Sequence, residues 1–64
     1  MLGENIKRLL KKNGYTQKEL AIRSQCTEPS ICQYLKNKRQ PNIKALKNIA
    51  VALGVTIDEL LEGV

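Results

Sequence analysis

Two helix-start signals lie so close together that they constrain the fold more than any other feature of the sequence. Thr16 can cap one helix, because Glu19 follows at the spacing of a capping box and can return the hydrogen bond. Thr27 can cap the next helix, because Pro29 fits a first helical turn, where its missing N–H costs nothing. Since proline disfavours helical geometry in the residue before it, Glu28 is the alternative cap. Two short helices must therefore follow one another almost directly.

The connection between these two helices predicts how they cross. We expect the first to end near Ser24 and the second near Lys36, with about two or three residues between them. So tight a connection forces a crossing angle of about 90–120°, which is the geometry of a helix-turn-helix. Ala21 is a small residue in the middle of the first of these helices, so the second can cross it closely.

Helical periodicity covers the rest of the chain, and strand signals are absent. A first helix ends before Gly14, since glycine tolerates the left-handed conformation of a helix end. Asn42 caps a fourth helix that ends at Gly54, and Thr56 starts a short fifth one. The predicted fold class is all-α, a compact five-helix bundle, with residues 1–64 forming a single domain.

Charge is unevenly distributed along the chain. The net charge is +5, and every basic residue lies between Lys7 and Lys47, where Glu19 and Glu28 are the only acids. With 11 Lys and Arg, this stretch carries 11 − 2 = +9. A basic body with an acidic tail favours a face that meets a polyanion, and the plainer alternative is a solvated surface.

The sequence offers little support for a catalytic site or a metal site. The chain has no His, its acids are scattered, and the spacing of Cys26 and Cys32 matches no zinc or redox motif. So short a bundle also leaves little room for a pocket. We expect no enzyme, no metal and no cofactor. Reduced thiols, and the lack of a signal peptide or a long apolar run, predict a cytoplasmic protein away from membranes.

Several short motifs occur together along the chain. They are Gln17-Lys18-Glu19-Leu20-Ala21, Thr27-x-x-Ser30-Ile31, Lys38-Arg39-x-Pro41 and Leu46-x-x-Ile49-Ala50-x-Ala52-Leu53-Gly54-Val55. In combination they resemble the Cro/phage-repressor family of helix-turn-helix proteins, also called XRE-type, from about Ile6 to Leu61. The resemblance implies a five-helix bundle of the lambda-repressor-like DNA-binding type. It also implies a third helix that enters the major groove, and commonly a dimer on a palindromic operator.

The resemblance carries site roles onto matching positions. It makes Gln17 a phosphate clamp. The face of the third helix that turns toward the bases comprises Thr27, Glu28, Pro29 and Gln33, and Ser30 beside them is a further DNA-binding residue. Contacts to the DNA backbone would come from Lys38, Arg39, Asn42 and Lys44.

The side-chain chemistry fits these roles. Gln33 can pair with adenine, Glu28 can accept from cytosine N4, and Pro29 can pack on a thymine methyl group. The plainer alternatives are a first-turn acid at Glu28 that favours the helix dipole, and solvated cations in the loop. Tyr34, at helical spacing from Ile31, is expected in the core rather than on a stacking surface.

Two residues depart from the family pattern. Gln25 stands in the turn and Asn37 stands after the third helix, where the family often has glycine. A non-glycine residue in left-handed geometry costs about 1 kcal/mol, so neither departure threatens the fold.

The sequence as a whole predicts a small transcriptional regulator, a repressor, that binds double-stranded DNA as a homodimer. The alternative is a protein-interaction module, such as an antitoxin or the DNA-binding arm of a larger complex. A cluster of C-terminal apolar residues serves either the core or a dimer surface: Val55, Ile57, Leu60, Leu61 and Val64.

Overall fold

The computed structural model describes residues 2–63 and contains five helices, with no strand among the residues it describes. They are α1 (Leu2–Asn13), α2 (Gln17–Arg23), α3 (Glu28–Leu35), α4 (Ile43–Leu53) and α5 (Ile57–Leu60). The fold class is therefore the expected one. Helices α2 and α3 each end one residue early, because Ser24 and Lys36 are their C-caps. Residues 24–27 separate them, a slightly longer turn than the sequence indicated.

Side chains cap the four helices that follow α1. At α3 the cap is Thr27 rather than Glu28, since the Thr27 Oγ1 accepts the Ser30 N–H at 3.2 Å. At α2 the Thr16 Oγ1 accepts the Glu19 N–H at 3.1 Å, but the structure shows no return bond from the Thr16 N–H to the Glu19 carboxylate. The predicted capping box is therefore only half formed there. A complete one starts α5, between Thr56 and Glu59.

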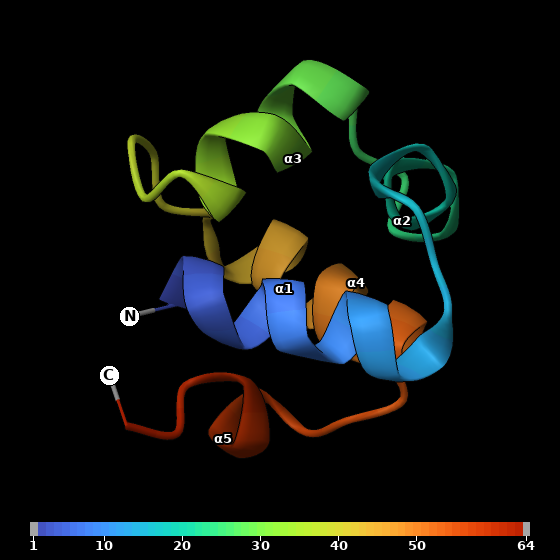
Figure 1. Cartoon of the computed structure of the whole chain (residues 1–64). Helices are drawn as coiled ribbons and strands as arrows, with labels where there is room; N and C mark the ends of the chain where they lie inside the picture. Colours follow the sequence, from blue (N-terminus) through green and yellow to red (C-terminus); the bar gives the residue numbers. More distant parts are fainter. Residues whose placement is uncertain (1, 64) are drawn as a thin grey trace.

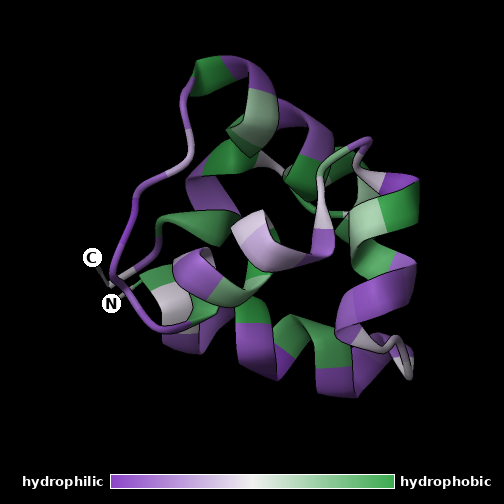
Figure 2. Ribbon diagram, turned by 90° about the horizontal axis from the view of Figure 1, so that it is seen from above, coloured by the Kyte–Doolittle hydropathy of each residue, from purple (hydrophilic) through white to green (hydrophobic). Residues whose placement is uncertain are grey.

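Apolar side chains from all five helices share one core. Figure 2 shows hydrophilic and hydrophobic residues alternating along the helices, as amphipathic helices around a common interior require. Tyr34 lies in this core at 6% exposure, as expected. The buried members are Ile6, Leu9, Leu10, Leu20, Ala21, Ile31, Tyr34, Leu35, Leu46, Ile49, Ala50, Leu53 and Leu60.

The C-terminal apolar cluster divides between core and surface. Leu60 is fully buried, Val55 and Ile57 pack partly against the core, and Leu61 is exposed. Val64 lies outside the described residues. The short helix α5 is held against α1 by Asn5, whose Nδ2 donates to the carbonyl oxygen of Leu60 at 2.9 Å.

Helices α2 and α3 cross at a large angle. In Figure 1, α2 is seen almost end-on while α3 runs across the view above α1 and α4. Ala21 is 4% exposed, so a small side chain stands where a larger one would keep the helices apart. This is the arrangement that the short connection predicts.

Candidate nucleic-acid interface

The outer face of α3 is open to solvent along its length. Ile31, Tyr34 and Leu35 anchor the inner face in the core. On the outer face, Glu28 and Gln33 are exposed. Because its inner face is fixed in the core, α3 holds the side chains of its outer face in a defined position. The exposure of these positions is the condition that base contact requires.

The first turn of α3 combines capping with presentation. The Thr27 Oγ1 donates to the Ser30 Oγ at 2.8 Å, besides accepting the Ser30 N–H. Thr27 is exposed and Ser30 is half-buried, while Pro29 is exposed beside them. The two hydroxyl groups thus hold each other, and Pro29 and Glu28 are the side chains of this turn that stand clear of the protein.

The loop after α3 presents two exposed cations, Lys38 and Arg39. Neither takes part in an ion pair within residues 2–63, so both charges are available to a partner. The Lys38 N–H donates to the Gln33 carbonyl oxygen at 3.0 Å, which closes the end of α3 and ties the loop to it. The loop backbone is therefore continuous with the helix that carries Gln33.

The remaining predicted positions lie on either side of α3. In Figure 1, α2 meets one end of α3 and the loop continues from the other. Gln17 is exposed at the first turn of α2, and Lys44 is exposed at the start of α4. Asn42 is exposed as well, but its Oδ1 accepts the Ala45 N–H at 2.8 Å as the cap of α4. Its amide group is the part left for a partner.

Lys36 extends the outer face of α3 and was not predicted as a site residue from the sequence. It is exposed at the end of α3 and follows Pro29 and Gln33 at helical spacing, so the three side chains share one side of the helix. The i, i+4, i+7 spacing alone could have identified it. It adds a positive charge between the outer face of α3 and the loop.

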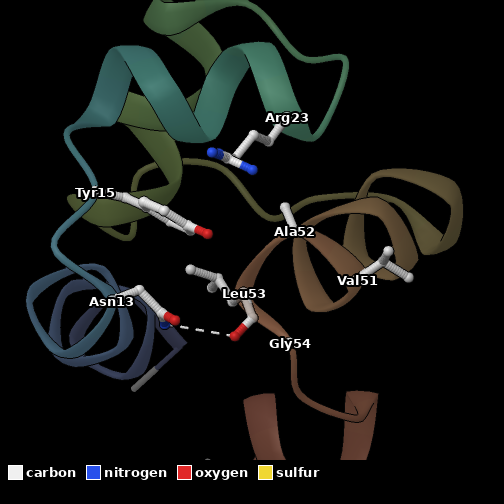
Figure 3. Close-up of a pocket in the computed structure, with 7 residues that line it drawn as sticks. All are labelled: Asn13, Tyr15, Arg23, Val51, Ala52, Leu53 and Gly54. Carbon is white, nitrogen blue, oxygen red and sulfur yellow. Dashed lines mark hydrogen bonds between the residues drawn. The ribbon is translucent and has the colours of Figure 1, made fainter.

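A cavity of about 450 Å³ opens elsewhere, between the ends of α1, α2 and α4 (Figure 3). It is open to solvent on a wide side, so it is a surface depression rather than an enclosed pocket. Two of its polar side chains, Arg23 and Asn13, have partners within the protein. The Arg23 guanidinium lies 4.6 Å from the centre of the Tyr15 ring, and the Asn13 Nδ2 donates to the carbonyl oxygens of Leu9 and Leu53.

Residues 2–63 contain no group of three or more His, Cys, Asp or Glu side chains placed to hold a metal ion, and Cys26 and Cys32 are free thiols. No helix in this part of the chain combines the length and apolarity needed to cross a bilayer.

Comparisons with known proteins agree on one family. A helix-turn-helix family model matches residues 6–60. The HTH-type transcriptional regulator YqaE of Bacillus subtilis is 36% identical over 63 residues, which are 98% of this chain and 54% of that protein. The HTH-type transcriptional regulator y4dJ of Sinorhizobium fredii is 33% identical over 61 residues, 95% of this chain and 79% of that protein.

A solved structure supports the same assignment. A chain of the SinR protein/SinI protein complex superposes with a TM-score of 0.93 at 28% identity, covering 98% of this chain and 62% of that one. The chain spans about half the length of YqaE and less than two thirds of the matched chain of the complex. Fold, motif pattern and relatives coincide, and the chain belongs to the helix-turn-helix family, with the XRE-type pattern of motifs.

Proposed function

We propose that the chain binds double-stranded DNA sequence-specifically as a small transcriptional regulator, a repressor, with α3 in the major groove. One observation carries the proposal: Ile31 is 1% exposed and locks α3 to the core, while Glu28 and Gln33 project from the opposite side. The major groove of B-DNA admits one α-helix. Relatives named as HTH-type transcriptional regulators support the same function.

Base recognition and backbone contact fall to different residues in this proposal. Gln33 offers adenine a bidentate pair, Glu28 accepts from cytosine N4, and Pro29 packs on a thymine methyl group. Backbone contacts come from residues around them, which supply affinity without sequence preference through counterion release. These are Gln17, Lys36, Lys38, Arg39, Asn42 and Lys44.

Thr27 and Ser30 lie at the first turn of α3, which faces the bases in this proposal. Because their hydroxyl groups bond to each other, we assign them first to the cap and only then to DNA. Their contribution to recognition is to hold Glu28 and Pro29 at the tip of α3.

A homodimer on a palindromic operator is the proposed assembly, since paired half-sites mirror a two-fold protein. Exposed apolar side chains on α4 support an association surface: Val51 is 80% exposed and Ile43 is 66% exposed. A second candidate function is a protein-interaction module, and it is favoured by one observation, that the matched chain was solved in a complex of the SinR and SinI proteins. A homodimer without any other protein in analytical ultracentrifugation would favour the DNA-binding regulator. Copurification of a different protein would favour the protein-interaction module.

The proposed function places the protein in the cytoplasm, where the free thiols of Cys26 and Cys32 stay reduced. It requires neither catalysis nor a cofactor.

Selection from a random duplex pool at two salt concentrations tests the function. We expect one enriched sequence and an affinity that falls steeply with salt. Binding no tighter than micromolar at about 50 mM salt, or a pool without enrichment, would contradict the proposal.

Two substitutions separate recognition from backbone contact. Gln33→Ala should change preference at one base pair at a cost of about 1–3 kcal/mol. Lys38→Ala should weaken all duplexes alike and flatten the salt dependence. If Gln33→Ala weakened every duplex equally, Gln33 would not be a base reader. Competition binding with the selected duplex and its single-pair variants makes the measurement.

A further inference from the structure

The chain leaves α3 through a residue that is bonded to the far N-terminal helix. Asn37 has a φ of 58°, the left-handed region. Its Oδ1 accepts the Gly3 N–H at 2.9 Å, across 34 residues of sequence, and its Nδ2 donates to the Glu4 Oε1 at 3.2 Å. One carboxamide thus joins the end of α3 to the first turn of α1.

Gly3 is shaped to this contact. A Cβ atom built on Gly3 would collide with the Leu35 carbonyl oxygen, and it would lie 2.9 Å from both the Tyr34 carbonyl oxygen and the Asn37 Oδ1. Only a residue without a side chain allows the first turn of α1 to lie so close to the last turn of α3. The two elements are therefore packed backbone to backbone.

The backbone geometry alone does not call for these side-chain bonds. Gln25, before α3, has the same φ of 58°, and its side chain makes no hydrogen bond within residues 2–63. The left-handed conformation of Asn37 therefore does not depend on the hydrogen bonds of its side chain. The pKa of Glu4 lies below its usual value, chiefly because of a hydrogen bond to the backbone N–H of Glu4 itself and then because of the N-terminal ammonium, with the Asn37 amide as the smallest contribution.

Asn37 directly precedes the two cations of the loop. Its own N–H donates to the Tyr34 carbonyl oxygen at 3.1 Å, and the Lys38 N–H donates to that of Gln33 at 3.0 Å. The direction in which Lys38 and Arg39 leave α3 is therefore set at Asn37, and Asn37 is held by α1.

We propose that Asn37 is a positioning residue of the DNA interface: it fastens the end of α3 to the first turn of α1 and so aims Lys38 and Arg39 at the DNA backbone. The inference rests on the proposed function and deepens it. It makes α1, which presents no predicted base contact, a determinant of DNA affinity.

Asn37→Gly tests the inference, with Gln25→Gly as its matched control. Each glycine keeps a φ that it adopts readily, and only the first removes bonds to α1. With the selected duplex, Asn37→Gly should bind on the order of tenfold more weakly and release about one or two fewer counterions in a salt titration. Base preference should not change, and Gln25→Gly should match the wild type.

The outcomes separate the two proposals. If the wild-type chain binds no duplex, the proposed function fails and this inference fails with it. If the wild type binds and Asn37→Gly keeps its affinity and its salt slope, or changes them as much as Gln25→Gly does, this inference alone is overturned. Circular dichroism at the binding temperature establishes that each variant is folded.

A charge rearrangement provides a second test that does not rely on glycine. Asn37→Asp keeps an acceptor for the Gly3 N–H but sets a carboxylate against Glu4, so it should weaken binding. Adding Glu4→Gln supplies a donor and restores the wild-type net charge, and we expect the wild-type salt slope to return. The control, Asn37→Asp with Glu62→Gln, has the same net charge without the new bond and should not recover. Equal recovery in both double variants would contradict the inference.

Discussion

The two ends of α3 differ in how they are held, although both contain a non-glycine residue with a φ of 58°. At the N-terminal end, beside Gln25, the bonds are local: the Cys26 N–H donates to the Ala21 carbonyl oxygen at 2.9 Å, and the Ser24 Oγ donates to that of Leu20 at 2.6 Å. At the C-terminal end, the Asn37 side chain bonds to α1. The helix is thus attached to its neighbour in sequence at one end and to the distant N-terminus at the other.

The same backbone conformation is thus stabilised in two ways. A non-glycine residue in the left-handed conformation costs about 1–2 kcal/mol. The turn before α3 offsets that cost with local hydrogen bonds to the last turn of α2. The turn after α3 offsets it with contacts that depend on the particular residues Gly3 and Asn37. Four substitutions, each compared by its effect on the free energy of unfolding, separate these two arrangements.

The largest effect is expected from Gly3→Ala at the C-terminal end of α3. The added Cβ meets the Leu35 carbonyl oxygen, and the backbone of α1 must shift to relieve the collision. We expect the free energy of unfolding to fall by about 1–3 kcal/mol, measured by urea denaturation. Lys7→Ala, an exposed change in the same helix, should leave it nearly unchanged. A Gly3→Ala variant as stable as the wild type would show that the two helix ends are not closely packed.

A smaller effect is expected from Thr27→Ala at the N-terminal end. It removes the Oγ1 that accepts the Ser30 N–H, and a lost cap costs about 1 kcal/mol. Thr27→Asn keeps a capping oxygen and should remain within a few tenths of the wild type. Thermal unfolding of the three proteins makes the comparison. If Thr27→Ala were as stable as the wild type, the Thr27 cap would not contribute to the stability of this end of α3.

The smallest effects come from the paired glycine substitutions, and we expect them to differ in sign. Gln25→Gly relieves about 1–2 kcal/mol of strain and adds about 0.5–1 kcal/mol of chain entropy. A net gain of about 0.5 kcal/mol should follow. Asn37→Gly also loses two hydrogen bonds, one part-buried and one exposed, each contributing about 0.5 kcal/mol, so a net loss of about 0.5 kcal/mol should follow. Urea denaturation of both variants in parallel checks this, and a gain of equal size in both would mean that the bonds to α1 contribute nothing.

Most of the fold follows from local signals in the sequence. Caps such as Thr27 and Asn42, the left-handed residues and the apolar periodicity each act within a few residues, and the structure bears them out. The exceptions are also local. The return bond to Thr16 does not form although Glu19 has the right spacing, because spacing permits that bond without requiring it.

The candidate site divides in the same manner. Exposure of Gln33, Lys38 and Arg39 could be predicted from helical periodicity and from the loop. The partner of Asn37 could not, because nothing near Asn37 in the sequence indicates that Gly3 packs against it. The cavity beside Tyr15 was also missed, since its walls come from helices whose separation depends on tertiary packing.

Methylation interference on the selected duplex is the most direct test of the placement of α3 in the major groove, because it reports which groove the helix occupies. If α3 occupies the major groove, methylation of guanine N7, which lies in that groove, should block binding within each half-site. N6-methylation of the adenine that Gln33 reads should weaken binding of the wild type but not of Gln33→Ala. Interference confined to adenine N3, in the minor groove, would contradict the placement of α3 and the function built on it.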